Sequence, residues 1–201
     1  MKLDFTDNSI LIIANGESIL KYKYGNIIDK FSNIVRINNF KTKKYEDYVG
    51  SKTTIWFNGA NQGLVKRDSF PKKIIVSIPS VILSKKENIQ SHISKRIKTK
   101  NFKHISLSEI KKYENEVGYS RLTTGMYAIL WSMHNYKNVY IHGYDFFINS
   151  KGHYYDGRIV KFFKNNNILK RGFKHNNNLE KLFILNLLKS KRIMQAKDLL
   201  I

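Results

Sequence analysis

The sequence contains no cysteine, only two prolines and only 15 acidic residues among its 201 positions. The lack of cysteine excludes disulfides, thiolate nucleophiles and cysteine-bound zinc, and it fits a reducing compartment. No stretch rich in glycine and proline divides the chain and no internal repeat occurs, so we expect a single domain. The first residues lack the apolar segment of a signal peptide, and no apolar run reaches the length of a membrane span. We therefore expect a cytoplasmic protein.

Several motifs of enzyme active sites are also missing. No H-E-x-x-H and no D-x-D occurs, which argues against a sugar transferase that holds a diphosphate through a divalent ion. No G-x-S-x-G is present, so a serine hydrolase is not indicated. The run Gly50-Ser51-Lys52-Thr53 resembles the end of a P-loop, but Tyr45 stands where the first glycine belongs, and the run precedes a predicted strand, not a helix. We expect no metal site and no P-loop.

Positive charge dominates the composition. Lys and Arg number 36 against 15 Asp and Glu, which gives a formal net charge of +21. Such a surface attracts polyanions, among them nucleic acid, anionic lipid headgroups and phosphorylated glycolipids. Many of the lysines lie among asparagines and isoleucines, as the codon usage of an AT-rich genome would also produce. A basic nucleic-acid-binding protein stays an alternative, but the sequence has no recognition-module motif such as an RNP sequence or a zinc finger.

The apolar residues predict an α/β domain. They make up 42% of the chain, with 13% aromatic residues, which is typical of a globular protein. Continuous apolar runs are typical of strands in a parallel sheet that is covered on both faces. Such runs predict strands at Ile10–Ala14, Ile34–Ile37, Thr53–Phe57, Lys73–Ile78 and Val139–Ile141. With a short helix over Ser18–Ile28 and a longer one after Gly125, they indicate one Rossmann-like nucleotide-binding domain with a mostly parallel sheet.

Polar residues follow the first two strands where each strand ends. Asn15-Gly16-Glu17-Ser18 follows the first strand, and Asn38 follows the second. Open α/β sheets bind ligands at this carboxyl edge. An asparagine amide offers two donors and an acceptor, which suit a ribose hydroxyl or a phosphate, although a single asparagine more often caps a turn. Two asparagines in equivalent places favour a ligand site.

Two histidines lie in positions suited to chemistry. His153 is followed by Tyr154 and Tyr155, and His175 precedes a predicted helix that has Glu180 in its first turn. A histidine can accept a proton from a hydroxyl near neutral pH, and a second one, protonated, can stabilise a departing phosphate. Each of them alone would more often be a surface residue or a histidine with satisfied hydrogen bonds.

Two basic segments complete the chain. Residues 84–120 are polar and basic, and we expect a helical lid or insertion there, in which Glu114 and Glu116 belong to a charged helix face and not to a catalytic pair. Residues 180–201 are expected to form a C-terminal helical segment. The basic, amphipathic part from Leu182 to Ile201 could hold the protein at an anionic membrane surface. We favour the other interpretation, a packing helix with a solvated basic end.

Taken together, these segments resemble the sialyltransferases of the animal type, with a smaller likeness to the bacterial lipooligosaccharide sialyltransferases. The four sialylmotifs occur here in family order and span residues 10–180. The long motif corresponds to IIANGESIL, Gly25–Asp29, Val35–Asn38 and Val49–Thr54, the short motif to Leu122–Met126 and Val139–Tyr144, the third motif to His153–Asp156 and the very short motif to His175–Glu180. The very short motif alone carries little weight, but the ordered set is a strong signal.

The resemblance implies a GT-A-like variant of the α/β fold. It also implies an inverting, metal-independent transfer of a nonulosonic acid, first of all sialic acid, from a CMP-activated donor to a hydroxyl of a glycan or glycolipid. His175 would be the general base on the acceptor hydroxyl, His153 with Tyr154 would stabilise the departing phosphate, and Glu180 would orient the loop that carries His175. The residues expected to bind the CMP donor are Asn15, Gly16, Ser18, Asn38, Thr123, Thr124, Gly125, Tyr154 and Tyr155.

The chain also departs from these families. The two motif cysteines that join the long and short motifs are absent, so hydrophobic packing must hold that junction, and Leu122 and Thr123 stand where proline and serine are usual. The absence of a membrane anchor and stem leads us to expect a soluble bacterial or viral form. CMP-Kdo or another CMP-nonulosonate would use the same nucleotide contacts and stays an alternative donor. The small size leaves little room for an acceptor domain, so a homo-oligomer or a partner could complete that site.

Overall fold

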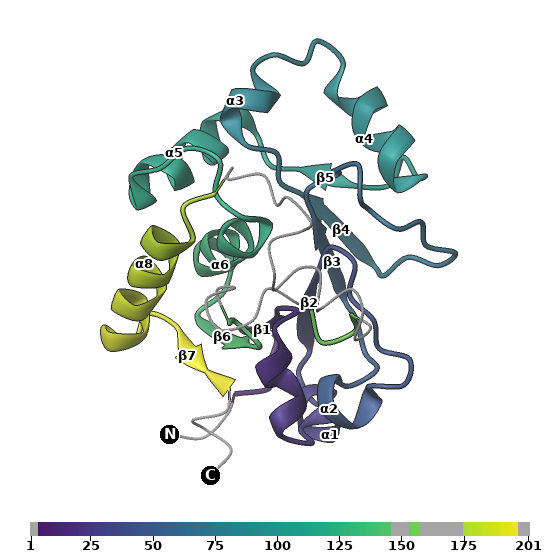
Figure 1. The fold of residues 1–201 in the computed structure, drawn as a ribbon, viewed down its shortest axis with the longest axis vertical. Coiled ribbons are helices and arrows are strands. Elements are labelled where there is room, and N and C mark those ends of the chain that lie inside the picture. The colour runs from purple at the N-terminus through teal and green to yellow at the C-terminus, as the bar shows by residue number, and fades with distance from the viewer. Residues whose placement is uncertain (1–3, 146–152, 157–174, 197–201) are drawn as a thin grey trace.

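In the part of the chain that the structure describes, seven parallel strands form a single sheet in the order β5-β4-β3-β2-β1-β6-β7. The computed structural model describes residues 4–145, 153–156 and 175–196 (Figure 1). The strands are β1 (Ser9–Ile13), β2 (Asn33–Ile37), β3 (Ile55–Asn58), β4 (Lys73–Val76), β5 (Lys103–His104), β6 (Asn138–His142) and β7 (Met194–Gln195). Every strand pair is parallel, which confirms the predicted α/β class and the mostly parallel sheet.

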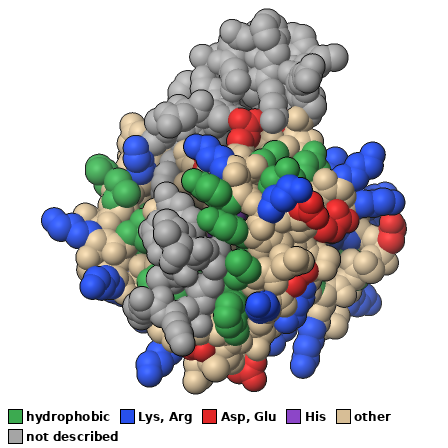
Figure 2. Space-filling model, turned by 90° about the horizontal axis from the view of Figure 1, so that it is seen from below, with side chains coloured by type: hydrophobic (Ala, Val, Ile, Leu, Met, Phe, Trp, Pro, Cys, Tyr) green, Lys and Arg blue, Asp and Glu red, His purple; other side chains and the backbone are tan. Residues whose placement is uncertain are grey.

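Helices flank this sheet. They are η1 (Glu17–Lys21), α1 (Gly25–Ile28), α2 (Glu46–Val49), α3 (Ser80–Leu83), α4 (Ile89–Ile97), α5 (Leu107–Val117), α6 (Thr124–Asn135) and α8 (Asn177–Lys189). Among the described residues, none of the helices combines the length and the apolarity that a bilayer crossing requires. On the face shown in Figure 2, the Lys and Arg side chains of the described residues are spread around the surface with acidic side chains among them, and these described residues form no continuous basic stripe.

Two hydrophobic cores cover the two faces of the sheet. Ile10 and Ile12 of β1 belong to the larger core, which includes residues of α4, α5, α6 and α8. Leu11 and Ile13 belong to the smaller core, which includes residues of η1, α1 and α2. All of these β1 side chains are buried, because successive residues of a strand point to opposite faces and both faces are covered. This arrangement explains why the strand reads as one continuous apolar run.

The predicted strands correspond to β1, β2, β3, β4 and β6, with ends that differ by one or two residues. The single helix predicted over Ser18–Ile28 is wrong, because η1 ends at Lys21 and α1 begins at Gly25, with Tyr22 extended between them. The break lets α1 approach α2 closely. A Cβ atom at Gly25 would lie 1.9 Å from the carbonyl oxygen of Glu46, so only glycine fits this contact.

The two basic segments contribute more to the core than their composition indicates. Helices are found in residues 84–120 as predicted, but this segment also supplies the edge strand β5 and buries Ile93, Ile110 and Tyr113 in the larger core. None of its residues lines the pocket described below. In the C-terminal segment the helix ends at Lys189, and the following residues form β7 beside β6, so the prediction of helix beyond that point is wrong. Residues 197–201 lie outside the described residues.

A buried arginine holds the loop that leads into β3. The guanidinium of Arg36 donates to the carbonyl oxygens of Val49 at 2.6 Å, Gly50 at 3.1 Å and Lys52 at 3.0 Å. Burial lowers the pKa of Arg36 to about 10, so the side chain stays charged at neutral pH. The GSKT run is thus part of a strand-entry loop and not of a P-loop, in agreement with the sequence.

We expect the Arg36→Met substitution to lower the free energy of unfolding by about 2–4 kcal/mol, because it leaves several buried carbonyl groups without donors. Urea unfolding would measure this loss, with the exposed Lys43→Met variant as the charge-matched control. A loss no larger than that of the control would show that water replaces the guanidinium at no cost.

Candidate active site

The pocket lies where the order of strands reverses. From β1 the chain runs outward through β2, β3, β4 and β5, and it then returns to place β6 on the other side of β1. Open α/β sheets form their binding crevice at such a point, at the carboxyl ends of the strands. Two turns meet there, joined by hydrogen bonds from Ala14 N to His142 O at 2.9 Å and from Gly16 N to Gly143 O at 3.0 Å.

Gly16 makes room for a carboxylate at the base of this pocket. A Cβ atom at Gly16 would lie 2.4 Å from Asp145 Cγ and 2.5 Å from the carbonyl oxygen of Gly143. The Asp145 carboxylate accepts a hydrogen bond from Ser18 N at 2.9 Å and another from the Ser18 hydroxyl. Asp145 lines the pocket. Ser18 does not line it, but its two hydrogen bonds hold the Asp145 carboxylate in place.

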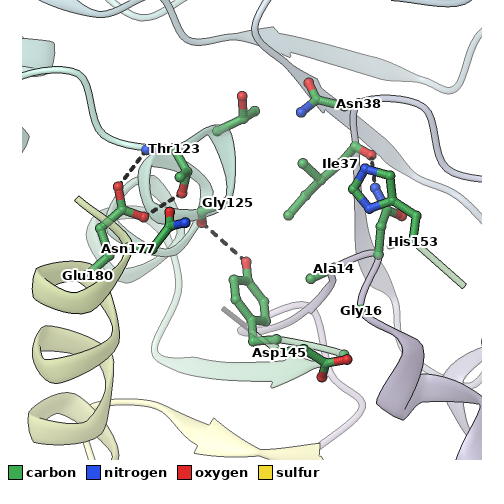
Figure 3. Close-up of a pocket in the computed structure, with 14 residues that line it drawn as sticks. Ala14, Gly16, Ile37, Asn38, Thr123, Gly125, Asp145, His153, Asn177 and Glu180 are labelled. Atoms are coloured by element: carbon green, nitrogen blue, oxygen red, sulfur yellow. Dashed lines mark hydrogen bonds between the residues drawn. The ribbon is translucent and has the colours of Figure 1, made fainter. Parts of the chain in front are cut away.

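The two predicted asparagines lie side by side at the ends of β1 and β2. Asn15 donates from Nδ2 to the carbonyl oxygen of Ile37 at 3.0 Å, while its Oδ1 atom is buried without a hydrogen-bond partner among the described residues. Asn38 has a positive φ of 48°, and its Oδ1 accepts from Gly59 N at 3.1 Å. Both residues line the pocket, where Figure 3 shows Asn38. A buried oxygen without a donor indicates that a ligand or water supplies one there.

The opposite wall is the beginning of α6. Thr123 is the N-cap residue, and its side-chain oxygen accepts from Met126 N at 3.1 Å. The N–H groups of Thr124 and Gly125 lie in the first turn, where a helix has no carbonyl partners for them and where its dipole favours an anion. Both residues line the pocket, and the ring of Tyr144 packs against Gly125, whose carbonyl oxygen accepts from the Tyr144 hydroxyl at 3.2 Å.

A buried glutamate fixes this helix start from α8. Glu180 is 4% exposed and accepts from Thr123 N at 2.7 Å and from the Thr123 hydroxyl at 2.5 Å (Figure 3). Burial raises the pKa of Glu180, and the hydrogen bonds from Thr123 partly oppose this shift. Glu180 thus connects α8 to the start of α6. The sequence predicted that Glu180 orients the loop that carries His175, whereas the hydrogen bonds of its carboxylate go to Thr123.

The third motif reaches the pocket through His153. The His153 ring packs against the ring of Tyr155, with 5.2 Å between centroids, and its backbone N–H donates to Asp156 Oδ2 at 2.7 Å. Tyr154 is buried, and its hydroxyl both donates to Lys41 O and accepts from Lys41 N. Tyr154 and Tyr155 do not line the pocket, so in this structure they support the histidine and the neighbouring loop.

His175 lies just before α8, two residues ahead of the pocket-lining Asn177. Its Nδ1 atom is 2.5 Å from the carbonyl oxygen of Arg121. Because a carbonyl oxygen can only accept, Nδ1 must carry the hydrogen, and Nε2 of the neutral ring is then the basic nitrogen. His175 is exposed and is not among the residues that line the pocket. An exposed basic nitrogen next to the start of α6 suits a substrate that projects out of the pocket.

Seven of the predicted site residues come together around one cavity: Asn15, Gly16, Asn38, Thr123, Thr124, Gly125 and His153. Asp145, Tyr144 and Asn177 also line the cavity and were not predicted. Asp145 lies three residues after the end of β6, in the loop at the ligand-binding edge, which is a signal that could have identified it. In the described residues, no group of three or more histidines and carboxylates is placed to hold a metal ion.

A family model described as glycosyltransferase family 29 (sialyltransferase) matches residues 8–192. The fold is similar to that of a mammalian sialyltransferase solved with Gal-beta-1-3GalNAc-ortho-nitrophenol, with a TM-score of 0.66 and 18% identity over 93% of this chain and 68% of that one. The sialyltransferase CstII of Campylobacter jejuni, solved with the substrate analogue CMP-3FNeuAc, gives a TM-score of 0.58 and 19% identity over 93% of this chain and 81% of that one.

The sialyltransferase Cst-I of Campylobacter jejuni gives a TM-score of 0.62 and 17% identity over 97% of this chain and 78% of that one. At such identities the likeness concerns the fold alone. The β-1,6-galactosyltransferase GALT29A of Arabidopsis thaliana is 42% identical over 53 residues, which are 26% of this chain and 13% of that protein. Because the family model covers nearly the whole chain, and the sheet has the same fold as these enzymes, the chain belongs to glycosyltransferase family 29, the sialyltransferase family.

Proposed function

We propose that this protein transfers a nonulosonic acid, with sialic acid as the first candidate, from a CMP-activated donor to a hydroxyl group of a glycan or glycolipid. The family, and the CMP-sugar analogue named with CstII, support this donor. The observation that carries the proposal is the arrangement of the pocket. Two asparagines, the start of α6 and His153 line the same pocket. Figure 3 shows Asn38 and His153 on the side opposite Thr123 and Gly125.

The nucleotide would lie along the carboxyl ends of β1, β2 and β6. The free Oδ1 of Asn15 can accept from a ribose hydroxyl or from the cytosine amino group, and Asn38 Nδ2 can donate to an oxygen of the nucleotide. The carboxylate of Asp145 keeps acceptor capacity beyond its bonds to Ser18, since each carboxylate oxygen has two lone pairs. These groups suit the uncharged parts of a nucleotide.

The phosphate would lie at the start of α6. Thr124 and Gly125 line the pocket and belong to the first turn of α6, and the N–H groups of a first helical turn are a natural anion site. His153 on the other side would donate to the phosphate oxygen that leaves the sugar. As the bond from the anomeric carbon to this oxygen breaks, both electrons stay with the oxygen, and these donors stabilise the new charge on CMP.

The acceptor would approach from the side of His175. Its hydroxyl oxygen attacks the anomeric carbon opposite the phosphate, and Nε2 of His175 takes the hydroxyl proton. Attack from the opposite face inverts the configuration at that carbon. The hydrogen bond to Arg121 O fixes the ring and its tautomer for this task. Incubation with CMP-sialic acid, CMP-Kdo and a panel of glycan acceptors, with CMP release and product mass as readouts, would test the reaction. No product and no acceptor-dependent CMP release from either donor would contradict it.

The plant relative supports a second candidate, transfer of galactose from a nucleotide-activated donor. That relative is named as a galactosyltransferase, and it shares 42% identity with this chain over 53 residues. The two candidates differ in the nucleotide that the pocket must hold. UDP-galactose in the same acceptor panel would therefore distinguish them, and a galactosylated product would replace the proposed function.

His153 gives a prediction that separates departure of the phosphate from activation of the acceptor. We expect His153→Ala to lower the rates of sugar transfer and of donor hydrolysis together, each by about 10²–10³-fold, because both reactions require the same phosphate to leave. Release of CMP, with and without acceptor, measures both rates. The His92→Ala variant, in a helix outside the pocket, is the control. A loss confined to transfer would contradict this role.

A further inference from the structure

Glu114 is a buried acid outside the pocket. It lies on α5 and is 5% exposed, so the prediction that it belongs to a charged helix face is wrong for Glu114, although Glu116 forms an ion pair with Arg192 at 3.7 Å near the surface. Its Oε1 accepts from Ser80 N at 3.0 Å and from the Tyr127 hydroxyl at 2.6 Å, and its Oε2 accepts from the Ser80 hydroxyl. The carboxylate thus joins α3, α5 and α6.

The surroundings of Glu114 keep it ionised. Burial opposes its charge, but hydrogen bonds from the side chains of Ser80 and Tyr127 and from backbone N–H groups outweigh burial and hold the pKa below its usual value. All four hydrogen bonds are donated to the carboxylate, as expected for an acceptor that carries charge. Glu114 is therefore a fixed acceptor in the interior.

One of its donors leads directly to the proposed base. Arg121 N donates to Glu114 Oε1 at 3.3 Å, while the carbonyl oxygen of Arg121 accepts from His175 Nδ1 at 2.5 Å. Arg121 has a positive φ of 69°, which is unfavourable for a residue with a side chain and persists only where the surroundings hold it. Two residues later, Glu180 binds Thr123 N. Two buried carboxylates, one from α5 and one from α8, thus hold the turn Arg121–Thr123.

We propose that Glu114 is a positioning residue for His175. By holding the N–H of Arg121, it fixes the peptide that precedes this residue. With the positive φ of Arg121 held in this way, the carbonyl oxygen of the following peptide faces the imidazole. Glu114 does not line the pocket and touches neither the nucleotide site nor His175 itself. This proposal rests on the proposed function of His175 as the base. The property that Glu114 would control is the tautomer of the His175 imidazole, which can be measured without any substrate.

The test compares two ways of disturbing the same buried cluster. Glu114→Ala removes the acceptor for Arg121 N, whereas Tyr127→Phe removes a donor to Glu114 and leaves the Arg121 contact in place. We expect Glu114→Ala to lower kcat for transfer roughly tenfold, with an unchanged Kd for CMP, because about one hydrogen bond is lost. Tyr127→Phe should leave kcat within twofold. Glu114→Gln should restore most of the activity, since its amide oxygen can still accept from Arg121 N.

The ¹⁵N chemical shifts of the His175 ring report its tautomer. If Glu114 served only the stability of the fold, its replacement would leave these shifts unchanged. In the wild-type protein we expect the Nδ1–H tautomer, and in Glu114→Ala a mixture of tautomers, with the signals assigned by their loss in His175→Ala. If Glu114→Ala does not fold, Glu114→Leu, which fills similar space but cannot accept a hydrogen bond, takes its place, with a tautomer shift expected in it and not in Glu114→Gln or Tyr127→Phe. An unchanged His175 spectrum in the variant that lacks the acceptor would overturn the proposal. A wild-type protein that shows the tautomer but transfers no sugar would instead contradict the proposed function.

Discussion

Replacing His175 with alanine is expected to lower kcat for sugar transfer by about 10²–10⁴-fold while leaving the Kd of CMP unchanged. The substitution removes the basic Nε2 that the hydrogen bond to Arg121 O orients, and His175 does not line the nucleotide pocket. Steady-state kinetics with saturating donor and acceptor measure the first effect, and calorimetric titration with CMP measures the second.

His134 provides a matched control for this variant. Its Nδ1 atom also lies at hydrogen-bond distance from a backbone carbonyl oxygen, that of Leu130 at 2.9 Å, but His134 lies at the other end of α6. His134→Ala should therefore keep the wild-type kcat. Turnover of His175→Ala within a few fold of the wild-type protein would show that another group, or water, takes the acceptor proton.

Replacing Gly16 with alanine is expected to weaken CMP binding by about 10–100-fold. A new Cβ atom would lie 2.4 Å from Asp145 Cγ and 2.5 Å from Gly143 O, so both turns at the base of the pocket must move. Overpacking of this kind costs about 1–3 kcal/mol, which corresponds to the stated range in affinity. The effect should appear in the Kd of CMP by calorimetry.

Gly63 is the control for this substitution, because a Cβ atom there would have its nearest neighbour at 3.9 Å. Gly63→Ala should bind CMP like the wild-type protein. If Gly16→Ala also kept the wild-type affinity while its thermal unfolding was unchanged, the nucleotide would bind elsewhere than at the meeting of the β1 and β6 turns.

The sequence was sufficient for the central part of the fold. The apolar residues of β1 and β2 are buried on both faces of the sheet, so these strands read as apolar runs, and the polar residues Asn15 and Asn38 follow them at the edge where ligands bind. The resemblance of the ordered motifs to the sialyltransferases then predicted the histidines and the start of α6 as parts of the site. Local pattern and global fold agree at these positions.

Other features could not be predicted because they depend on partners distant in the chain. The edge strands β5 and β7 have only two residues each, too few for a periodic signal. Glu114 lies in a polar, basic segment, and its burial results from donors in α3 and α6. Asn177 lines the pocket because the start of α8 lies next to the start of α6, where Glu180 accepts a hydrogen bond from Thr123 N.

Calorimetric titration with CMP, in EDTA and with UMP, UDP, GMP and a short oligonucleotide for comparison, tests the central claim most directly. The pocket formed by Asn15, Asn38 and the start of α6 should bind CMP selectively without added metal, and Gly16→Ala should weaken that binding to the extent given above. Preference for a uridine nucleotide would contradict the CMP-sugar donor. Absence of nucleotide binding, with oligonucleotide binding that weakens as salt rises, would contradict the enzyme function and identify the charge of +21 as the functional feature.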